Sequence, residues 1–168
     1  MKNETIGFIG LGNVGKKLAN NLINYKNKIY LYDKNLKTYS YFKNKNIYLC
    51  KSCKDLVEHS KIIITCLPSP NAVNKVINSI LPYISDKHLW IEMSTTDKNE
   101  MIRLTKIFKS KGGNVLECPV TGGEHRAASG NISIFVAGDR KNFKRAFLIL
   151  SKMGHQILYC GKIGNASI

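Results

Sequence analysis

The chain has 168 residues, of which 43% are hydrophobic and 22% are charged, a composition typical of one ordinary globular domain and not of a disordered chain. Its longest apolar runs have only the length of a β-strand, so we expect no membrane-spanning segment. The formal net charge of +15 is of the kind found in nucleic-acid-binding proteins. Because the lysines are scattered and arginines are few, we expect no nucleic-acid partner; the charge would instead attract an anionic cofactor and substrate.

Apolar runs and amphipathic runs alternate along the whole sequence. The apolar runs predict strands at residues 5–9, 28–32, 46–49, 61–66, 88–92, 114–118, 132–137 and 155–159. The amphipathic runs predict helices near residues 13–25, 35–43, 52–59, 70–81, 97–111 and 140–152. This alternation predicts an α/β fold, a Rossmann-type doubly wound and mostly parallel sheet with helices on both faces. Ligands of such sheets bind at the carboxyl ends of the strands, so the loops that follow the strands should carry the chemistry.

The first of these loops holds three glycines with the spacing Gly10-x-Gly12-x-x-Gly15. Between a strand and a helix, this spacing is typical of a dinucleotide-binding unit. Gly10 would permit a tight turn, Gly12 would let the backbone approach a pyrophosphate, and Gly15 would let the helix pack closely on the strand. The alternative is an ordinary strand-to-helix turn that binds nothing.

The second strand ends in Asp33, at the place where an acidic residue holds the hydroxyls of the adenosine ribose. A carboxylate there would repel the 2′-phosphate of NADP, so Asp33 favours NAD. Lys34 beside it would tolerate a phosphate and weakens that preference. A polar turn without a ligand is the alternative interpretation.

Three later loops also follow predicted strands. Residues 67–71 hold two prolines that fix a turn, and residues 93–97 are rich in hydroxyls, although both loops also have the composition of a helix N-cap. In the third loop, Thr121 precedes the paired Gly122 and Gly123. Their backbone N–H groups and the Thr121 hydroxyl would form a nest for a carboxylate. A tight connection between two strands is the alternative there.

The cysteines and the N-terminus indicate the cellular compartment of the protein. Five cysteines, an odd number, in a chain whose first strand begins almost at once predict reduced thiols, no targeting segment and a cytoplasmic protein. Cys50 and Cys53 have CxxC spacing, but no second pair completes a zinc site, so we expect no metal.

With these loops placed, the sequence resembles the β-hydroxyacid dehydrogenase family, and most of all its 3-hydroxyisobutyrate dehydrogenase branch. The blocks that carry the resemblance lie in consistent order over the whole chain, at residues 7–15, 67–68, 92–97, 119–123, 126–133 and 159–164. The resemblance implies an NAD(P)-dependent oxidoreductase that acts on a CH–OH group and oxidises a small 3-hydroxy acid to its semialdehyde. A glyoxylate or succinic semialdehyde reductase, a 6-phosphogluconate dehydrogenase relative and a catalytically silent nucleotide-binding scaffold remain alternatives.

Motifs and resemblance together imply the site residues. The substrate carboxylate is expected at Thr121, Gly122 and Gly123. The cofactor, NAD rather than NADP, is expected at Gly10, Leu11, Gly12, Asn13, Val14, Gly15, Asp33, Leu67, Pro68, Asn71 and Thr95. Relative to some members of the family, the stretch between Pro68 and Asn71 is one residue shorter.

In this family, the segment that matches residues 161–168 leads within a few residues to a catalytic lysine, which is the general acid and base. An all-helical domain follows it and completes the active site and the dimer. We therefore expect residues 1–160 to form the NAD(P)-binding domain, residues 161–168 to begin the linker to a missing helical domain, and the catalytic lysine to lie beyond Ile168. These 168 residues alone should be inactive, and the full-length protein should be a homo-oligomer.

Overall fold

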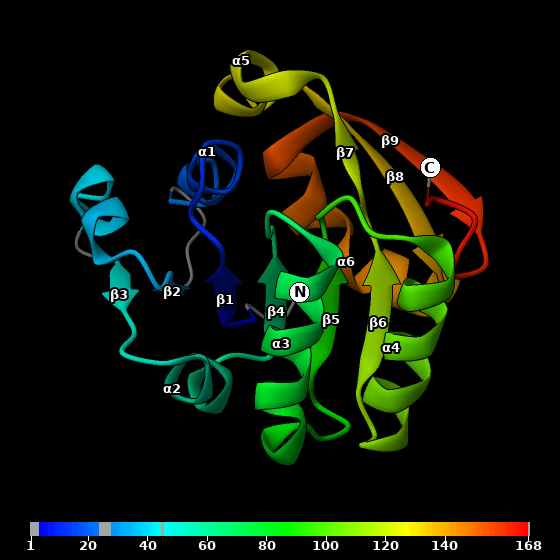
Figure 1. Cartoon of the computed structure of the whole chain (residues 1–168). Coiled ribbons are helices and arrows are strands. Elements are labelled where there is room, and N and C mark those ends of the chain that lie inside the picture. Colours follow the sequence, from blue (N-terminus) through cyan, green and yellow to red (C-terminus); the bar gives the residue numbers. More distant parts are fainter. Residues whose placement is uncertain (1–3, 24–27, 45, 168) are drawn as a thin grey trace.

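The computed structural model describes residues 4–23, 28–44 and 46–167, which form one sheet with helices on both faces (Figure 1). The strands are β1 (Ile6–Ile9), β2 (Ile29–Tyr32), β3 (Ile47–Leu49), β4 (Ile62–Thr65), β5 (Leu89–Glu92), β6 (Asn114–Glu117), β7 (Val120–Thr121), β8 (Ile132–Gly138) and β9 (Gly154–Gly161). The helices are α1 (Gly15–Asn20), α2 (Cys53–His59), α3 (Pro70–Ile80), α4 (Lys98–Ser110), α5 (Gly123–Ala128) and α6 (Arg140–Met153), with 3₁₀ turns η1 (Leu36–Tyr41) and η2 (Leu81–Tyr83).

The strand order is β3-β2-β1-β4-β5-β6-β8-β7, and β9 pairs with β8. Strands β1 to β6 are mutually parallel, whereas β8 runs antiparallel to β6 and to β7. The chain winds from β1 outward to β3 and then returns to β4 on the other side of β1. This reversal opens a crevice beside the carboxyl ends of β1 and β4. The predicted Rossmann-type, mostly parallel sheet is therefore confirmed.

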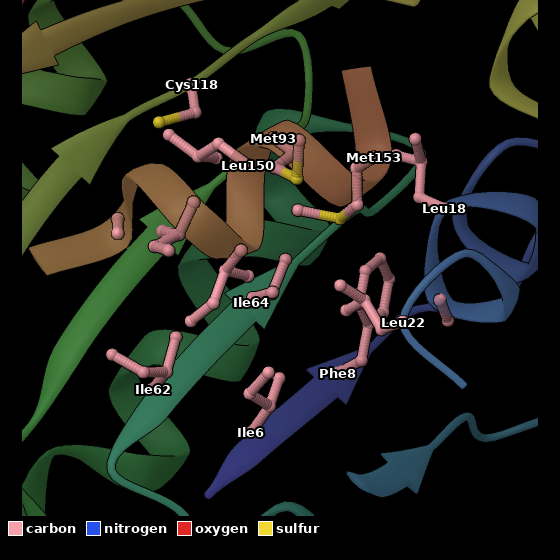
Figure 2. Packing of buried hydrophobic residues seen from close by; sticks show 14 of the residues in the cluster. Ile6, Phe8, Leu18, Leu22, Ile62, Ile64, Met93, Cys118, Leu150 and Met153 are labelled. Atoms are coloured by element: carbon pink, nitrogen blue, oxygen red, sulfur yellow. The ribbon is translucent and has the colours of Figure 1, made fainter. Parts of the chain in front are cut away.

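The central strands are buried on both faces, which explains their nearly continuous apolar sequences. On one face, α1 and α6 cover the sheet, and Leu18, Leu22 and Leu150 pack against its apolar side chains (Figure 2). On the other face, α2, α3 and α4 cover it around the fully buried Trp90 and Phe108. The two layers hold the strand ends, and hence the loops between strands and helices, in fixed relative positions.

Two predicted elements differ from the structure, and one short strand was not predicted. The helix predicted over 13–25 is shorter: α1 ends at Asn20, a turn follows to residue 23, and residues 24–27 lie outside the described part. The helix predicted over 35–43 is the 3₁₀ turn η1, which has no buried residue. The short strand β7 was not predicted, and it pairs with β8 through Val120 and Thr121.

The described residues hold free cysteines and no cluster for a metal. All five thiols are unpaired, and burial raises the pKa of Cys50 to about 12 and that of Cys53 to about 11. No group of three or more His, Cys, Asp or Glu residues within the described ranges could hold a metal ion. In the same ranges, no helix is long and apolar enough to cross a membrane.

Candidate functional site

A cavity of about 730 Å³ opens at the carboxyl ends of the strands, at the place where the strand order reverses. The loops after β1, β2, β4, β5 and β6 all contribute to its wall. The structure brings most of the sequence-predicted residues into this one wall: Gly10, Gly12, Asn13, Val14, Gly15, Asp33, Leu67, Pro68, Thr95, Thr121, Gly122 and Gly123.

Two predicted residues do not line the cavity. The side chain of Leu11 is fully buried in the core, and only its backbone takes part in the glycine turn. Asn71 is exposed on the first turn of α3, where Ser69 is the N-cap. Neither residue is among those that form the cavity wall.

The glycine turn is shaped by close backbone contacts. A Cβ on Gly10 would lie 2.2 Å from the Cys66 carbonyl oxygen, and one on Gly15 would lie 2.0 Å from the Gly10 carbonyl oxygen. At Gly12 the same construction meets no protein atom within 4 Å. Gly10 and Gly15 are therefore required by the fold, whereas the bare backbone of Gly12 faces the open cavity.

The turn also presents free hydrogen-bond donors. Among the hydrogen bonds of the described residues, none uses the backbone N–H of Gly12, Asn13, Val14 or Gly15. Helix α1 has only six residues, so its dipole adds little. The unpaired N–H groups themselves make this turn a place for an anion.

Asp33 connects the end of β2 to the glycine turn. Its Oδ2 accepts a hydrogen bond from the Leu11 N–H at 2.6 Å, and its Oδ1 accepts one from the Asn35 N–H at 2.7 Å. The backbone N–H of Asp33 donates to the Tyr39 hydroxyl at 3.3 Å. The carboxylate is thus held in a fixed orientation at the cavity wall, and each oxygen keeps a lone pair for a ligand hydroxyl.

The loops after β4 and β5 are joined by hydrogen bonds behind the cavity wall. The Leu67 N–H donates to Ser94 Oγ at 2.8 Å, while the Ser94 N–H donates to the buried carboxylate of Glu92. The Thr65 hydroxyl also donates to Glu92, at 2.6 Å. Burial raises the pKa of Glu92 to about 7. This network leaves Thr95 exposed at the cavity surface.

The predicted nest lies on the opposite side of the cavity from Asp33, after β6. Gly122 and Gly123 have φ values of 131° and 76°, which a residue with a Cβ rarely adopts. Thr121 is exposed beside them. Helix α5, which follows, is tied to α1 by an ion pair of 2.7 Å between Lys17 and Glu124. The nest and the glycine turn are therefore held on adjacent helices.

Several cavity residues were not predicted from the sequence. Lys75 and Val76 contribute from the second turn of α3, and Cys66 and Met93 contribute from strand ends. Ala72, Lys75 and Val76 lie on one helix face, and this spacing is the signal that could have revealed them. Burial raises the pKa of the Cys66 thiol to about 12, so it is not a nucleophile at neutral pH.

This arrangement can bind one anion at the glycine turn, another at the nest, and a diol at Asp33. Of the described residues in the cavity wall, those beside the nest are small, apolar or hydroxyl-bearing, and no lysine, histidine or carboxylate stands among them. The wall can therefore hold and orient ligands, whereas proton transfer at the nest requires a group from elsewhere.

Comparisons with known proteins agree with this geometry. The family described as the NAD binding domain of 6-phosphogluconate dehydrogenase matches residues 5–161. The mitochondrial 3-hydroxyisobutyrate dehydrogenase of Rattus norvegicus is 35% identical over 165 residues, which are 95% of this chain and 49% of that protein. Glyoxylate/succinic semialdehyde reductase 1 of Arabidopsis thaliana is 27% identical over 165 residues, which are 96% of this chain and 57% of that protein.

A solved structure shows the same likeness. Mycobacterium tuberculosis 3-hydroxyisobutyrate dehydrogenase with L-serine superposes with a TM-score of 0.93 at 27% identity, over 98% of this chain and 57% of that one. These likenesses confirm the resemblance predicted from the motifs. The chain spans about half the length of the curated relatives it matches.

Proposed function

The chain belongs to the family of the NAD binding domain of 6-phosphogluconate dehydrogenase, and we propose that it is the cofactor-binding part of an NAD-dependent dehydrogenase for a small 3-hydroxy acid. One observation carries the proposal: a single cavity joins the glycine turn and Asp33 to the nest at Thr121, Gly122 and Gly123. A dinucleotide site and a carboxylate site thus face the same space.

The residues present fit a nicotinamide dinucleotide. The open space at Gly12, where a Cβ would meet no atom within 4 Å, would take the pyrophosphate, and the unpaired N–H groups of the turn would bind it. Asp33 would accept the ribose hydroxyls. Strands β1, β4 and β5 separate β2 from β6, so the two ends of the site are roughly 19 Å apart at ~4.8 Å per strand. An extended dinucleotide would therefore lie across the strand ends.

The substrate end would be organised by the nest. The Thr121 hydroxyl and the N–H groups of Gly122 and Gly123 would hold a carboxylate and so orient the neighbouring hydroxyl-bearing carbon. A bound nicotinamide supplies the hydride acceptor. The acid and base that the oxidation needs would be the lysine that the family resemblance places beyond Ile168.

The substrate class follows from the relatives. L-serine, named with the Mycobacterium tuberculosis enzyme, is a 3-hydroxy acid with a carboxylate, and this supports a small carboxylate-bearing substrate here. The name of the Arabidopsis thaliana relative favours a second candidate, the reduction of a small aldehyde acid such as glyoxylate or succinic semialdehyde. The same nest would hold either carboxylate.

A binding titration tests the proposal. We expect NAD⁺ to bind the 168-residue chain in isothermal titration calorimetry, and Gly122→Val to retain this binding. In a second titration, 3-hydroxyisobutyrate is added to the chain with NAD⁺ already bound. We expect its binding heat to be lost in Gly122→Val, because valine rarely adopts the φ of 131° at this position and would distort the nest. No NAD⁺ binding at millimolar concentration overturns the proposal. We also expect little turnover of 3-hydroxyisobutyrate or glyoxylate by these residues alone, and robust turnover would show that the lysine is not required.

We propose three further features of the full-length protein. They are the division into a cofactor domain over residues 1–160 and a linker from residue 161, the homo-oligomer and the cytoplasmic location. The rat relative is named as mitochondrial, and fluorescence microscopy of the tagged full-length protein tests the cytoplasmic location.

A further inference from the structure

Two loops of the cavity wall lie between the glycine turn and the nest. In the sheet, β4 and β5 separate β1, which the glycine turn follows, from β6, which the nest follows. Leu67 and Pro68 come after β4, and Thr95 comes after β5. A dinucleotide with its pyrophosphate at the glycine turn would therefore lay its nicotinamide half against these two loops.

Packing alone does not fix the loop after β5. Besides the large cavity, a second cavity of about 20 Å³ borders this loop. Ser94 and Thr95 line both cavities, so they form a thin wall between them. The second cavity has room for about one water molecule and for no side chain. Hydrogen bonds must therefore supply the support that neighbouring side chains do not.

One buried carboxyl group supplies these hydrogen bonds. Glu92, at the end of β5, is only 1% exposed and accepts the Ser94 N–H. The Ser94 hydroxyl oxygen in turn accepts the Leu67 N–H at 2.8 Å. Thr95 follows Ser94 directly in the chain, so the position of Ser94 also limits where Thr95 can lie. Through Ser94, Glu92 is thus connected to both loops.

The carboxyl group is itself anchored in the core. The Thr65 hydroxyl donates to Glu92 at 2.6 Å, and the same hydroxyl oxygen accepts the indole N–H of Trp90 at 2.8 Å. Both Thr65 and Trp90 are fully buried. A buried polar network whose members are all satisfied is rigid. These bonds therefore hold the carboxyl group, and with it Ser94, in a fixed position relative to the sheet.

We propose that Glu92 is a positioning residue of the cofactor site, which acts through Ser94 to hold the two loops against the nicotinamide half of the dinucleotide. The inference rests on the proposed function, since it concerns the same cofactor site. Glu92 is not part of the wall of the large cavity, so it touches no ligand there. It governs the affinity for the nicotinamide half and leaves the affinity for the adenosine half unchanged.

Two ligands that share the adenosine half separate this role from a loss of folding. The dissociation constants of NAD⁺ and of ADP-ribose, which lacks the nicotinamide, are measured by calorimetry for the wild-type chain, Glu92→Ala and Ser94→Ala. We expect the wild-type chain to bind NAD⁺ more tightly than ADP-ribose. This preference should fall about fivefold in each variant, the effect of one lost hydrogen bond. ADP-ribose should bind both variants with unchanged affinity, which also shows that they are folded.

Two further variants serve as matched controls. Glu92→Gln keeps an oxygen that can accept the Ser94 N–H, so it should retain the wild-type preference for NAD⁺. Glu117 is likewise a buried carboxylate at a strand end, but it accepts hydrogen bonds from Gly164 and Ser167. We therefore expect Glu117→Ala to leave the preference unchanged.

The outcomes separate the inference from the function beneath it. If NAD⁺ and ADP-ribose weaken equally in Glu92→Ala and Ser94→Ala, or if neither weakens, the positioning role is wrong although the dinucleotide site stands. A preference that falls as far in Glu117→Ala as in Glu92→Ala also overturns the role, as does a wild-type chain that binds NAD⁺ no more tightly than ADP-ribose. Failure of both ligands to bind the wild-type chain overturns the proposed function itself and the positioning role with it.

Discussion

The space that a side chain would occupy at Gly12 contains no protein atom and is open to a ligand. A Cβ there would meet no atom within 4 Å, whereas one at Gly15 would lie 2.0 Å from a backbone oxygen. We therefore expect Gly12→Ala to change the free energy of unfolding by less than about 1 kcal/mol, while NAD⁺ binding weakens at least tenfold, on the order of 1.4 kcal/mol. Urea unfolding and calorimetric titration measure the two effects.

The matched control for this substitution is Gly15→Ala. Its Cβ would clash with the Gly10 carbonyl oxygen, so we expect a loss of roughly 1–3 kcal/mol in unfolding free energy. Cofactor binding in Gly12→Ala at wild-type strength would contradict the placement of the pyrophosphate at this turn.

Glu92 gives stability a pH dependence. Burial raises its pKa from 4.5 to about 7, so the folded chain keeps a proton that the unfolded chain releases. Its contribution is complete below pH 4.5 and is lost as the pH rises toward 7, a decline of about 3 kcal/mol in unfolding free energy. We expect Glu92→Gln to remove this decline, as measured by urea unfolding across that range.

The comparison of wild type and variant isolates Glu92 from other titrating groups. Burial lowers the pKa of His88, and this shift acts in the opposite direction, because protonation of His88 destabilises the fold at low pH. Equal pH profiles for the wild-type chain and Glu92→Gln would show that folding does not shift the pKa of Glu92.

The secondary-structure elements that could be predicted from the sequence are those whose residues all lie in the same environment. Strands β1, β4 and β5 are buried along their whole length, so their unbroken apolar runs identify them. The glycine turn and Asp33 were also predictable, because their residue types are fixed by backbone approach and by chemistry. Because parallel strands end at the same edge of the sheet, the residues that follow β1, β4 and β5 line one cavity.

Two kinds of element could not be predicted: those in which side chains compete for the backbone hydrogen bonds of a helix, and those that exist only by pairing with a strand distant in the sequence. In η1, the Thr38 and Ser40 hydroxyls donate to backbone carbonyls, and such bonds compete with a regular helix. Leu36 in the same turn is 66% exposed, so no apolar face holds it on the sheet. Strand β7 exists only through β8, a partner distant in sequence. The helical spacing of Lys75 with Ala72 and Val76 marks one face of α3, but only the packing of α3 shows that this face lines the cavity.

The segment after β9 is held by one buried carboxylate. Glu117, at the end of β6, accepts a hydrogen bond from the Gly164 N–H at 2.6 Å and another from the Ser167 hydroxyl. We expect Glu117→Ala to release residues 162–167, so that the Gly164 amide exchanges its hydrogen at least about tenfold faster. Hydrogen exchange measured by mass spectrometry or NMR reports this change.

Glu100→Ala is the control for this release, because Glu100 is a helical carboxylate that pairs with Arg103 on α4. It should leave exchange at Gly164 unchanged. Unaltered exchange in Glu117→Ala would mean that packing alone, and not the carboxylate, fixes the segment.

Over the whole molecule, the net charge of +15 produces a positive field that acts on any anionic ligand. Among the described residues of the cavity wall, only Lys34 and Lys75 are cationic, so we expect much of this attraction to act over distances that salt screens. We expect the dissociation constant of NAD⁺ to rise several-fold between about 0.05 and about 0.5 M NaCl. NADP⁺ should show a steeper rise, because it carries one more phosphate than NAD⁺. Adenosine, which is uncharged, should show almost no change. An equal salt dependence for adenosine and NAD⁺ would mean that the scattered lysines do not guide the cofactor, and that the glycine turn alone accounts for its affinity.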